Sequence, residues 1–242
     1  MTENQIIIGI PGKWKDRTEL IQTVASQSEG YLLAGNIFHN KDKNITFQAE
    51  IQDYEPTLKE TFSYASKDAF SESLLAEINE HTFTVYIIAD ISADTGNVTD
   101  LIDAGAAILR AGGMAVKIET AGIAHSKEDW QQLHQSPDIL SLYAHFATII
   151  GEEDYYCSFG MKAFGLPDAV TLNTMSPKEA AALLNTFNYY HLGERPLFTT
   201  GETFSIHQDA PDFILTGLRD FRYEEDHPFY NPFGLWNLGT SK

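Results

Sequence analysis

Apolar and polar positions along the first third of the chain alternate between strand-like and helical patterns. The β-branched run Ile6–Ile10 predicts a buried strand, and Pro11 and Gly12 stop it. A helix is expected from Asp16, because this residue suits an N-cap, Glu19 follows three residues later, and apolar residues then recur at helical spacing. The chain is therefore expected to begin with a strand followed by a helix.

Two extended runs, 31–38 and 45–51, come next, and the polar stretch 40–44 between them predicts a hairpin loop. The second run alternates apolar and polar residues, which is typical of a strand with one wet face. A helix over about 67–79 and a buried strand over 83–88 complete the order β-α-β-β-α-β. This order is that of the ferredoxin-like arrangement, so we predict an α+β fold whose first half, residues 1–95, is ferredoxin-like.

The second half, residues 96–242, is expected to open with a linking helix over 98–111. Further strands are expected over 114–119, 155–161, 170–172 and 203–207, with helical pattern over 126–150, broken at Pro137, and over 177–190. One interpretation is that this half duplicates the ferredoxin-like order and that both halves form one compact unit. The tail from Pro211 is rich in aromatic residues, which favours packing against the body over disorder.

Charge and composition exclude several classes of partner. The chain carries 16 Lys and Arg against 34 Asp and Glu, a formal charge of −18, and so acidic a surface repels phosphate backbones and anionic lipids. We therefore expect neither a nucleic-acid nor a membrane partner. The acidic opening Met1-Thr2-Glu3 and the lone Cys157 differ from a secretory signal and a disulfide framework, which favours a cytoplasmic protein.

Several segments resemble a known family. They are 106–119, 122–126, 156–161, 164–169 and the ending Asn-Pro-Phe-Gly-x-Trp at 231–236. Together they are similar to the uncharacterised bacterial proteins that carry domain of unknown function 4261. One departure is that Ser158 and Phe159 separate Cys157 from Gly160, where the resemblance implies a more compact Tyr-x-Cys-Gly-Met. The resemblance implies no activity, cofactor or partner.

The strand 114–119 and the turn after it carry the densest candidate chemistry. Lys117 and Glu119 project from the same face of the strand, Gly122 lies in the turn, and Ser126 is placed to cap the next helix, with His125 beside it. A strand end, a glycine turn and a helix N-terminus form a common anion site, in which these side chains would supply a charge clamp, an acid or base, and a proton shuttle. The alternative is an ion pair on a solvated strand, a simple helix cap and an exposed histidine.

Three further residues are outer candidates. Cys157 would act as a nucleophile only with a histidine and an acid nearby, and its apolar neighbours favour a buried thiol instead. Asp168 and Glu202 are candidate ligand-binding residues of the same pocket. The spacing of the eight histidines matches no metal-binding motif, so no metal site is predicted from local spacing. A site assembled from distant segments, for instance His125 with His191 or His207, stays open, and the sequence leaves the cofactor unknown.

Two hypotheses of function remain open. The first is an acidic interaction or regulatory protein, of the toxin-neutralising kind for example, that binds a basic protein by electrostatic complementarity. The second is a small-molecule enzyme or sensor with a pocket around the strand 114–119 and the turn to Ser126. A concave pocket that gathers Lys117, Glu119 and His125 would favour the second hypothesis. The sequence leaves the oligomeric state open.

Overall fold

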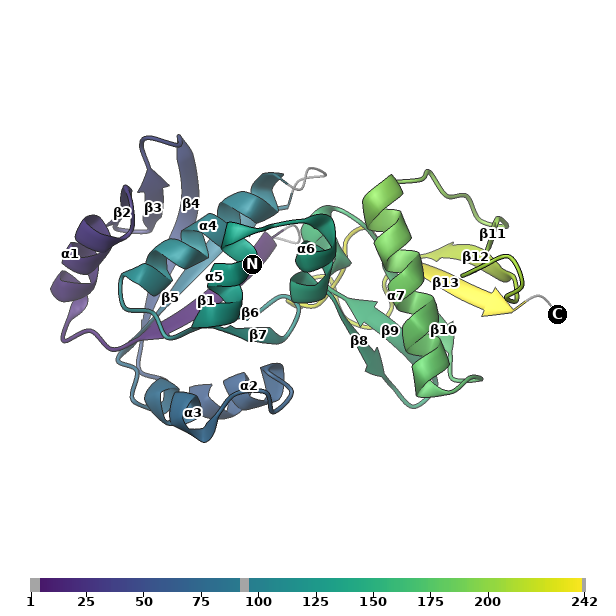
Figure 1. The fold of residues 1–242 in the computed structure, drawn as a ribbon, viewed down its shortest axis with the longest axis horizontal. Helices are drawn as coiled ribbons and strands as arrows, with labels where there is room; N and C mark the ends of the chain where they lie inside the picture. Colours follow the sequence, from purple (N-terminus) through teal and green to yellow (C-terminus); the bar gives the residue numbers. More distant parts are fainter. Residues whose placement is uncertain (1–4, 92–95, 241–242) are drawn as a thin grey trace. The chain divides into compact units, whose positions relative to one another are not determined.

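The computed structural model describes residues 5–91 and 96–240 and confirms an α+β fold built around two sheets (Figure 1). In the described residues, the chain divides into an N-terminal unit, Gln5–Asp90 together with residues 96–137, and a C-terminal unit, Ile91 together with the chain from Asp138 onward. The sequence placed the boundary at 95/96, and residue 95 lies outside the described residues. Among the described residues, no helix combines the length and apolar character that crossing a membrane requires.

The N-terminal unit holds a seven-stranded sheet in the order β2-β3-β4-β5-β1-β6-β7, in which all neighbours are antiparallel. Its elements are β1 (Gln5–Gly12), α1 (Arg17–Gln27), β2 (Tyr31–Ala34), β3 (Ile37–Asn40), β4 (Ile45–Asp53), α2 (Leu58–Ala65), α3 (Glu72–Asn79), β5 (Phe83–Asp90), α4 (Gly96–Arg110), β6 (Ala115–Ile118), β7 (Ile123–Ser126) and α5 (Lys127–Gln135). The expected hairpin loop at 40–44 is present between β3 and β4.

The ferredoxin-like arrangement predicted for residues 1–95 is not confirmed. In that arrangement the first strand would lie between the third and fourth expected strands, whereas β5 lies between β1 and β4. The helical connection from β4 to β5 therefore joins antiparallel neighbours and does not cross over another strand. The expected strand 31–38 is in fact the hairpin β2–β3, because the chain turns at Gly35, whose φ is +60°.

Helices cover both faces of this sheet. The face that carries Ile8 packs on α4, since a Cβ on Gly105 would lie 3.1 Å from Cδ1 of Ile8. The opposite face packs on α2 and α3 through Ala115 and Ala124, which join Phe62 and Ile78 in one apolar cluster. Two candidate residues on this sheet can therefore contact each other only if their side chains lie on the same face.

The C-terminal unit holds a six-stranded sheet in the order β11-β12-β13-β10-β9-β8. Its elements are α6 (Ile139–Phe146), β8 (Thr148–Gly151), β9 (Tyr155–Phe159), the 3-10 turn η1 (Met161–Phe164), β10 (Asp168–Leu172), α7 (Pro177–Glu194), β11 (Thr203–Phe204), β12 (Phe213–Leu218) and β13 (Leu235–Thr240). The pair β10–β13 is parallel, so this sheet does not repeat the topology of the first, and the expected duplication is wrong. The aromatic tail supplies β12 and β13, which the sequence did not predict.

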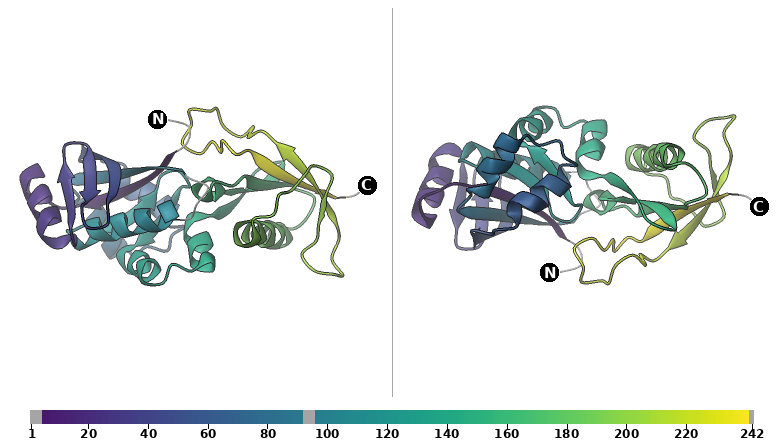
Figure 2. Two further views of the ribbon diagram at one scale, coloured as in Figure 1. Left: turned by 90° about the horizontal axis from the view of Figure 1, so that it is seen from above. Right: turned by 90° about the horizontal axis from the view of Figure 1, so that it is seen from below.

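The two faces of the second sheet are covered differently. Helix α7 packs on one face through Leu183, Leu184 and Phe187, which meet Ala169 and Leu238 of the strands. The loop 219–231 lies on the opposite face, as Figure 2 shows with α7 and the yellow loop on either side of the sheet. Helix α7 begins with the expected Ser176 and Pro177, and Ser176 forms a reciprocal capping box with Glu179.

Replacement of Gly160 by alanine should destabilise the C-terminal unit. Gly160 has a φ of +106°, and a Cβ there would lie 1.8 Å from the carbonyl oxygen of Phe146. We expect Gly160→Ala to lower the free energy of unfolding by at least about 2 kcal/mol, measured by urea denaturation. The control Gly193→Ala, on α7 with no atom within 4 Å of the added Cβ, should stay within about 1 kcal/mol of the wild type. Equal effects would contradict this explanation.

Candidate functional site

Lys117 and Glu119 form an ion pair on one face of the first sheet. Lys117 Nζ lies 2.7 Å from Glu119 Oε2, and their side chains are 15% and 22% exposed. The pair lies beside Gly9 of β1, where an added Cβ would be 2.9 Å from both Glu119 Oε1 and the Tyr86 ring. Burial, followed by the charges of Glu119 and Glu55, raises the pKa of Tyr86 above its usual range. The two side chains therefore share a face, as the sequence predicted.

His125 projects from the opposite face of the sheet. Its partner in the register is Val116, whereas Lys117 pairs with Ala124, so side chains at 117 and 125 alternate to opposite sides. The His125 ring lies 5.9 Å from the Trp130 ring of α5, centroid to centroid. The expected clamp of Lys117, Glu119 and His125 therefore does not converge on one pocket.

The turn and the helix cap after this strand are present as expected. Gly122 has a φ of +66°, and its N–H donates to the carbonyl of Ile118 at 2.8 Å. Ser126 Oγ accepts from the N–H of Asp129 at 3.1 Å and also donates to the Asp129 carboxylate at 2.7 Å. Because Glu128 and Asp129 already place two carboxylates in the first turn of α5, this helix N-terminus is poorly suited to an anion.

The outer candidates Cys157 and Asp168 lie together in the C-terminal unit, around a buried arginine. The Arg222 side chain is 1% exposed and lies 2.8 Å from a carboxylate oxygen of both Asp168 and Asp220. It also stacks 4.2 Å from the centre of the Phe159 ring. Asp168 accepts further hydrogen bonds from the Met161 N–H at 3.1 Å and from the Asn231 amide at 2.9 Å. These contacts occupy Asp168 inside the fold, so a ligand would have to displace them.

The remaining groups near this arginine are also internal. Burial lowers the pKa of Lys162 to about 8, against the opposing charges of Asp168 and Asp220, and its ammonium donates to the carbonyls of Pro228 and Tyr230. Glu202 is separate from this group, since its carboxylate accepts from the N–H of Thr199 in an exposed loop at 2.8 Å. The candidates Cys157, Asp168 and Glu202 therefore form no common ligand site.

A second polar cluster, which the sequence analysis missed, surrounds Asp103 of α4. Its carboxylate accepts from Tyr31 OH at 2.8 Å and Lys43 Nζ at 2.7 Å and lies 2.9 Å from His134 Nε2. Burial alone would raise the pKa of Asp103, but the hydrogen bonds from Lys43, Tyr31 and His134 hold it below its usual range. The cluster ties β2, the 40–44 loop, α4 and α5 together, and no local spacing in the sequence indicates it.

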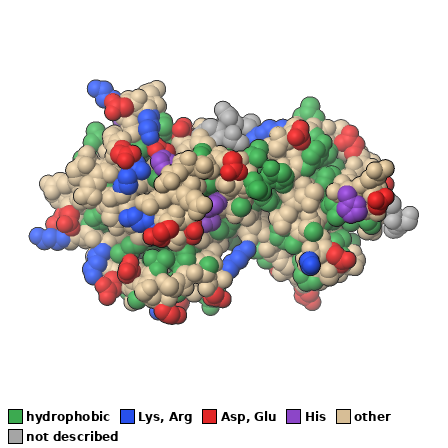
Figure 3. Space-filling view, viewed as in Figure 1, with side chains coloured by type: hydrophobic (Ala, Val, Ile, Leu, Met, Phe, Trp, Pro, Cys, Tyr) green, Lys and Arg blue, Asp and Glu red, His purple; other side chains and the backbone are tan. Residues whose placement is uncertain are grey.

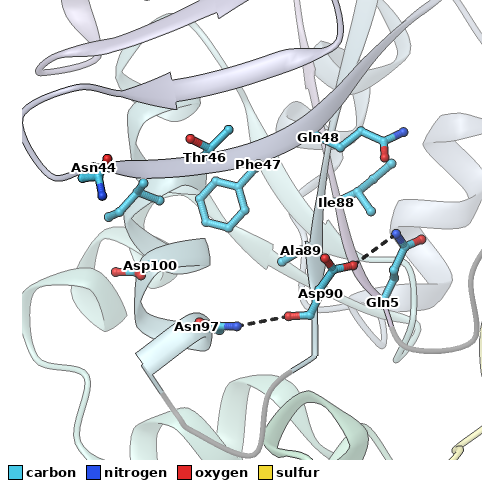
Figure 4. Close-up of a pocket in the computed structure, with 11 residues that line it drawn as sticks. Gln5, Asn44, Thr46, Phe47, Gln48, Ile88, Ala89, Asp90, Asn97 and Asp100 are labelled. Atoms are coloured by element: carbon cyan, nitrogen blue, oxygen red, sulfur yellow. Dashed lines mark hydrogen bonds between the residues drawn. The ribbon is translucent and has the colours of Figure 1, made fainter.

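A polar hollow lies next to this cluster in the N-terminal unit (Figure 4). It encloses about 310 Å³ and is lined by Gln5, Asn44–Gln48, Ile88–Asp90, Asn97 and Asp100. Asn97 donates to the Asp90 carbonyl at 3.2 Å, and Gln5 Nε2 lies 3.5 Å from Asp90 Oδ1. The amide and carboxylate groups suit a small polar molecule that donates hydrogen bonds. In the part of the chain that the structure describes, no three His, Cys, Asp or Glu side chains are placed to hold a metal ion.

Removal of the buried guanidinium should destabilise the fold strongly. Arg222→Met leaves Asp168 and Asp220 buried without their cation, so we expect a loss of about 3–5 kcal/mol at pH 7 in urea denaturation. Burial would raise the pKa of Asp220, but Arg222 holds it below its usual range. The wild type should therefore lose stability as the pH falls below about 4, while the defect of Arg222→Met should shrink over the same range.

The matched control is Arg219→Met, three residues away, whose side chain is 71% exposed beside Glu225. This variant should lose less than about 1 kcal/mol. A defect of Arg222→Met that is equally small, or that does not change with pH, would contradict the role given to this cluster.

Cys157 should be unreactive in the folded protein. Its side chain is buried, and burial raises the pKa of its thiol to about 11 against the opposing charge of Arg222. We expect a thiol reagent such as 5,5′-dithiobis(2-nitrobenzoate) to leave native protein unlabelled at pH 8 and to label one thiol per chain in 6 M guanidinium. Rapid stoichiometric labelling of the native protein would restore Cys157 as a candidate nucleophile.

Comparison with known proteins connects the buried arginine cluster to a family. Curated proteins and solved structures gave no match to the chain. A family model does match, over residues 157–236, which include Cys157, Asp168 and Arg222. The segments 106–119 and 122–126, which suggested the same resemblance, lie outside the matched range. The matching model is that of the domain of unknown function DUF4261, which confirms the family resemblance for residues 157–236.

Proposed function

We propose that this protein is a cytosolic bacterial interaction or regulatory protein, and that its partner is a basic protein. A protein that neutralises a toxin is one form of this function. The observation that carries the proposal is that acidic side chains of the C-terminal unit are exposed at its surface, whereas two of its basic side chains are buried. Two acidic triplets, Glu152–Asp154 and Glu224–Asp226, are exposed there, whereas Lys162 and Arg222 are buried in internal contacts.

Several other basic side chains are also engaged within the protein. Lys43 and Lys117 pair with carboxylates, and Lys127 donates to the carbonyl of Leu109 at 2.8 Å. The excess of acidic groups therefore reaches the solvent. On the face seen in Figure 3, Asp and Glu side chains are spread over both units rather than gathered into one patch. This face therefore offers no single broad acidic patch, and the support for a basic partner is the net charge of −18, which favours fast, salt-dependent association with a positively charged protein.

The geometry of the predicted chemical cluster also supports binding over catalysis. Lys117 and Glu119 neutralise each other on one face of the sheet, while His125 packs near Trp130 on the other face. General acid–base catalysis needs such groups within hydrogen-bond reach of one substrate. An enzyme that uses these three residues together would need a rearrangement of the sheet.

The alternative function is a small-molecule sensor or enzyme, and the hollow beside the Asp103 cluster is the observation that favours it. Its volume of about 310 Å³ lies at the lower end of the usual range for ligand pockets. Its lining residues come from β1, β4, β5 and α4, whereas the sequence hypothesis placed the pocket around 114–119. Ligand recognition there would involve Asp90, Asn97 and Asp100 in place of Lys117, Glu119 and His125.

Native mass spectrometry of the protein purified from its own host distinguishes these functions. Under mild conditions at low salt we expect a stoichiometric basic protein to remain bound, and we expect 0.5 M salt to release it, because screening weakens contacts between exposed charges. A retained small molecule with no protein partner would support the alternative function. A mass that corresponds to the protein alone at every salt concentration would contradict a constitutive complex.

A further inference from the structure

The face of the second sheet opposite α7 is only partly covered. The loop 219–231 closes the part around Cys157 and Phe159, and large apolar side chains at the margins of this part remain exposed. Four of them lie on the strands and one, Phe221, lies on the loop itself, and they are each 37% to 59% exposed: Ile150, Leu172, Ile214, Leu218 and Phe221. We refer to these five residues as the open face. Single exposed apolar residues are ordinary, whereas several on one sheet face are typical of an interaction surface.

The register places these residues on one side of the sheet. Ile150 lies opposite Cys157, Leu172 opposite Tyr155, and Leu218 opposite Leu235, and directly paired residues share a face. Phe221 joins them because its ring lies 5.7 Å from that of Tyr155 in a T-shaped contact. The alternate residues, such as Tyr156 and Leu238, contribute to the core under α7 instead.

Packed aromatic rings support the covered end of this face. The Phe159 ring lies 5.8 Å from Tyr223 and 5.9 Å from Phe229, and Tyr223 stacks on His227 at 4.2 Å. Arg222 holds the same loop against the sheet by its ion pairs with Asp168 and Asp220. The open face is therefore bordered by an ordered loop, so a partner would meet a largely preformed surface.

Acidic residues border this apolar surface. The triplet Glu152–Asp154 forms the turn that leads into Tyr155, and the triplet Glu224–Asp226 follows Tyr223 in the loop. Burial, followed by the charges of Cys157 and Glu152, raises the pKa of Tyr155. Burial, opposed by the charge of Arg222 and reinforced by that of Glu152, raises the pKa of Tyr223. Apolar contact area and negative charge thus occur together on one side of the C-terminal unit.

We infer that the open face is a docking site for a protein segment that combines Lys or Arg with large apolar side chains. The apolar side chains of such a segment would cover Leu172 and Phe221, and its cations would face the two acidic triplets. This inference rests on the proposed function and adds its location and the apolar part of the partner. It also lies within the segment 157–236 that matches the family, except for Ile150 and the first triplet.

Selection from a random 12-residue peptide library on the intact protein tests the inference. We expect the selected peptides to be enriched in Lys or Arg together with Leu, Phe or Trp. A synthetic copy of the best peptide should bind Phe221→Ser and Leu172→Ser at least tenfold more weakly than the wild type. The double charge variant Glu224→Lys/Asp226→Lys should show a loss of at least tenfold that shrinks as salt is added.

Matched controls separate local from general effects. Leu197→Ser changes a residue that is 95% exposed in the same unit, and Glu72→Lys/Glu77→Lys changes the same charge on α3. Both should bind the peptide within twofold of the wild type. Because all the altered side chains are exposed or partly exposed, urea denaturation should show unchanged stability for every variant.

Other results of the peptide experiment would contradict either the docking site alone or the docking site together with the proposed function. If basic peptides bind but the open-face variants have no effect, the docking site is wrong while the proposed function stands. If no basic peptide is enriched, the proposed function fails with the inference. If Phe221→Ser instead converts a dimer to a monomer in size-exclusion chromatography with light scattering, a second copy of this chain occupies the face, which also contradicts the inference.

Discussion

The buried guanidinium of Arg222 holds the C-terminal unit together. It joins Asp168, at the start of β10, to Asp220 in the loop that follows β12, and it stacks on Phe159 of β9. A charge buried to this extent is stable only with partners in place, so the contact fixes the loop 219–231 on the sheet. The position of that loop in turn decides which part of the sheet face stays open and where the second acidic triplet reaches the solvent.

Local signals in the sequence predicted most of the helices, because caps and apolar spacing act over a few residues. Helix α2 was missed, however, and the helix expected over 67–79 begins only at Glu72. Asp16, Ser126 and Ser176 each cap a helix as expected. Strands β7 and β8 were missed, and β8 replaces the end of the helical pattern expected over 126–150. Strands β12 and β13 were also missed: β13 pairs with β10, which lies more than sixty residues earlier in the chain, and β12 pairs with β13. The ferredoxin-like prediction was not confirmed, because the order of elements along the chain does not specify which strands become neighbours in the sheet.

The candidate site was predicted in its parts and not as a whole. Lys117 and Glu119 share a face because alternation along one strand is local, but the face of His125 depends on the register between β6 and β7. Arg222 lies in the run Phe-Arg-Tyr-Glu-Glu-Asp, which has the composition of a solvated surface. Only the pairing of β9, β10 and β13 brings its partners together, so no spacing in the sequence could indicate a buried charge cluster there.

We propose that the protein acts through an acidic, apolar surface on its C-terminal unit. Hydrogen–deuterium exchange of the intact protein, with and without a bound basic peptide, measures this most directly. We expect slower exchange over 150–155, 170–174 and 221–229, with the N-terminal unit unchanged. Slower exchange confined to 44–48 and 88–90, around the polar hollow, would contradict it.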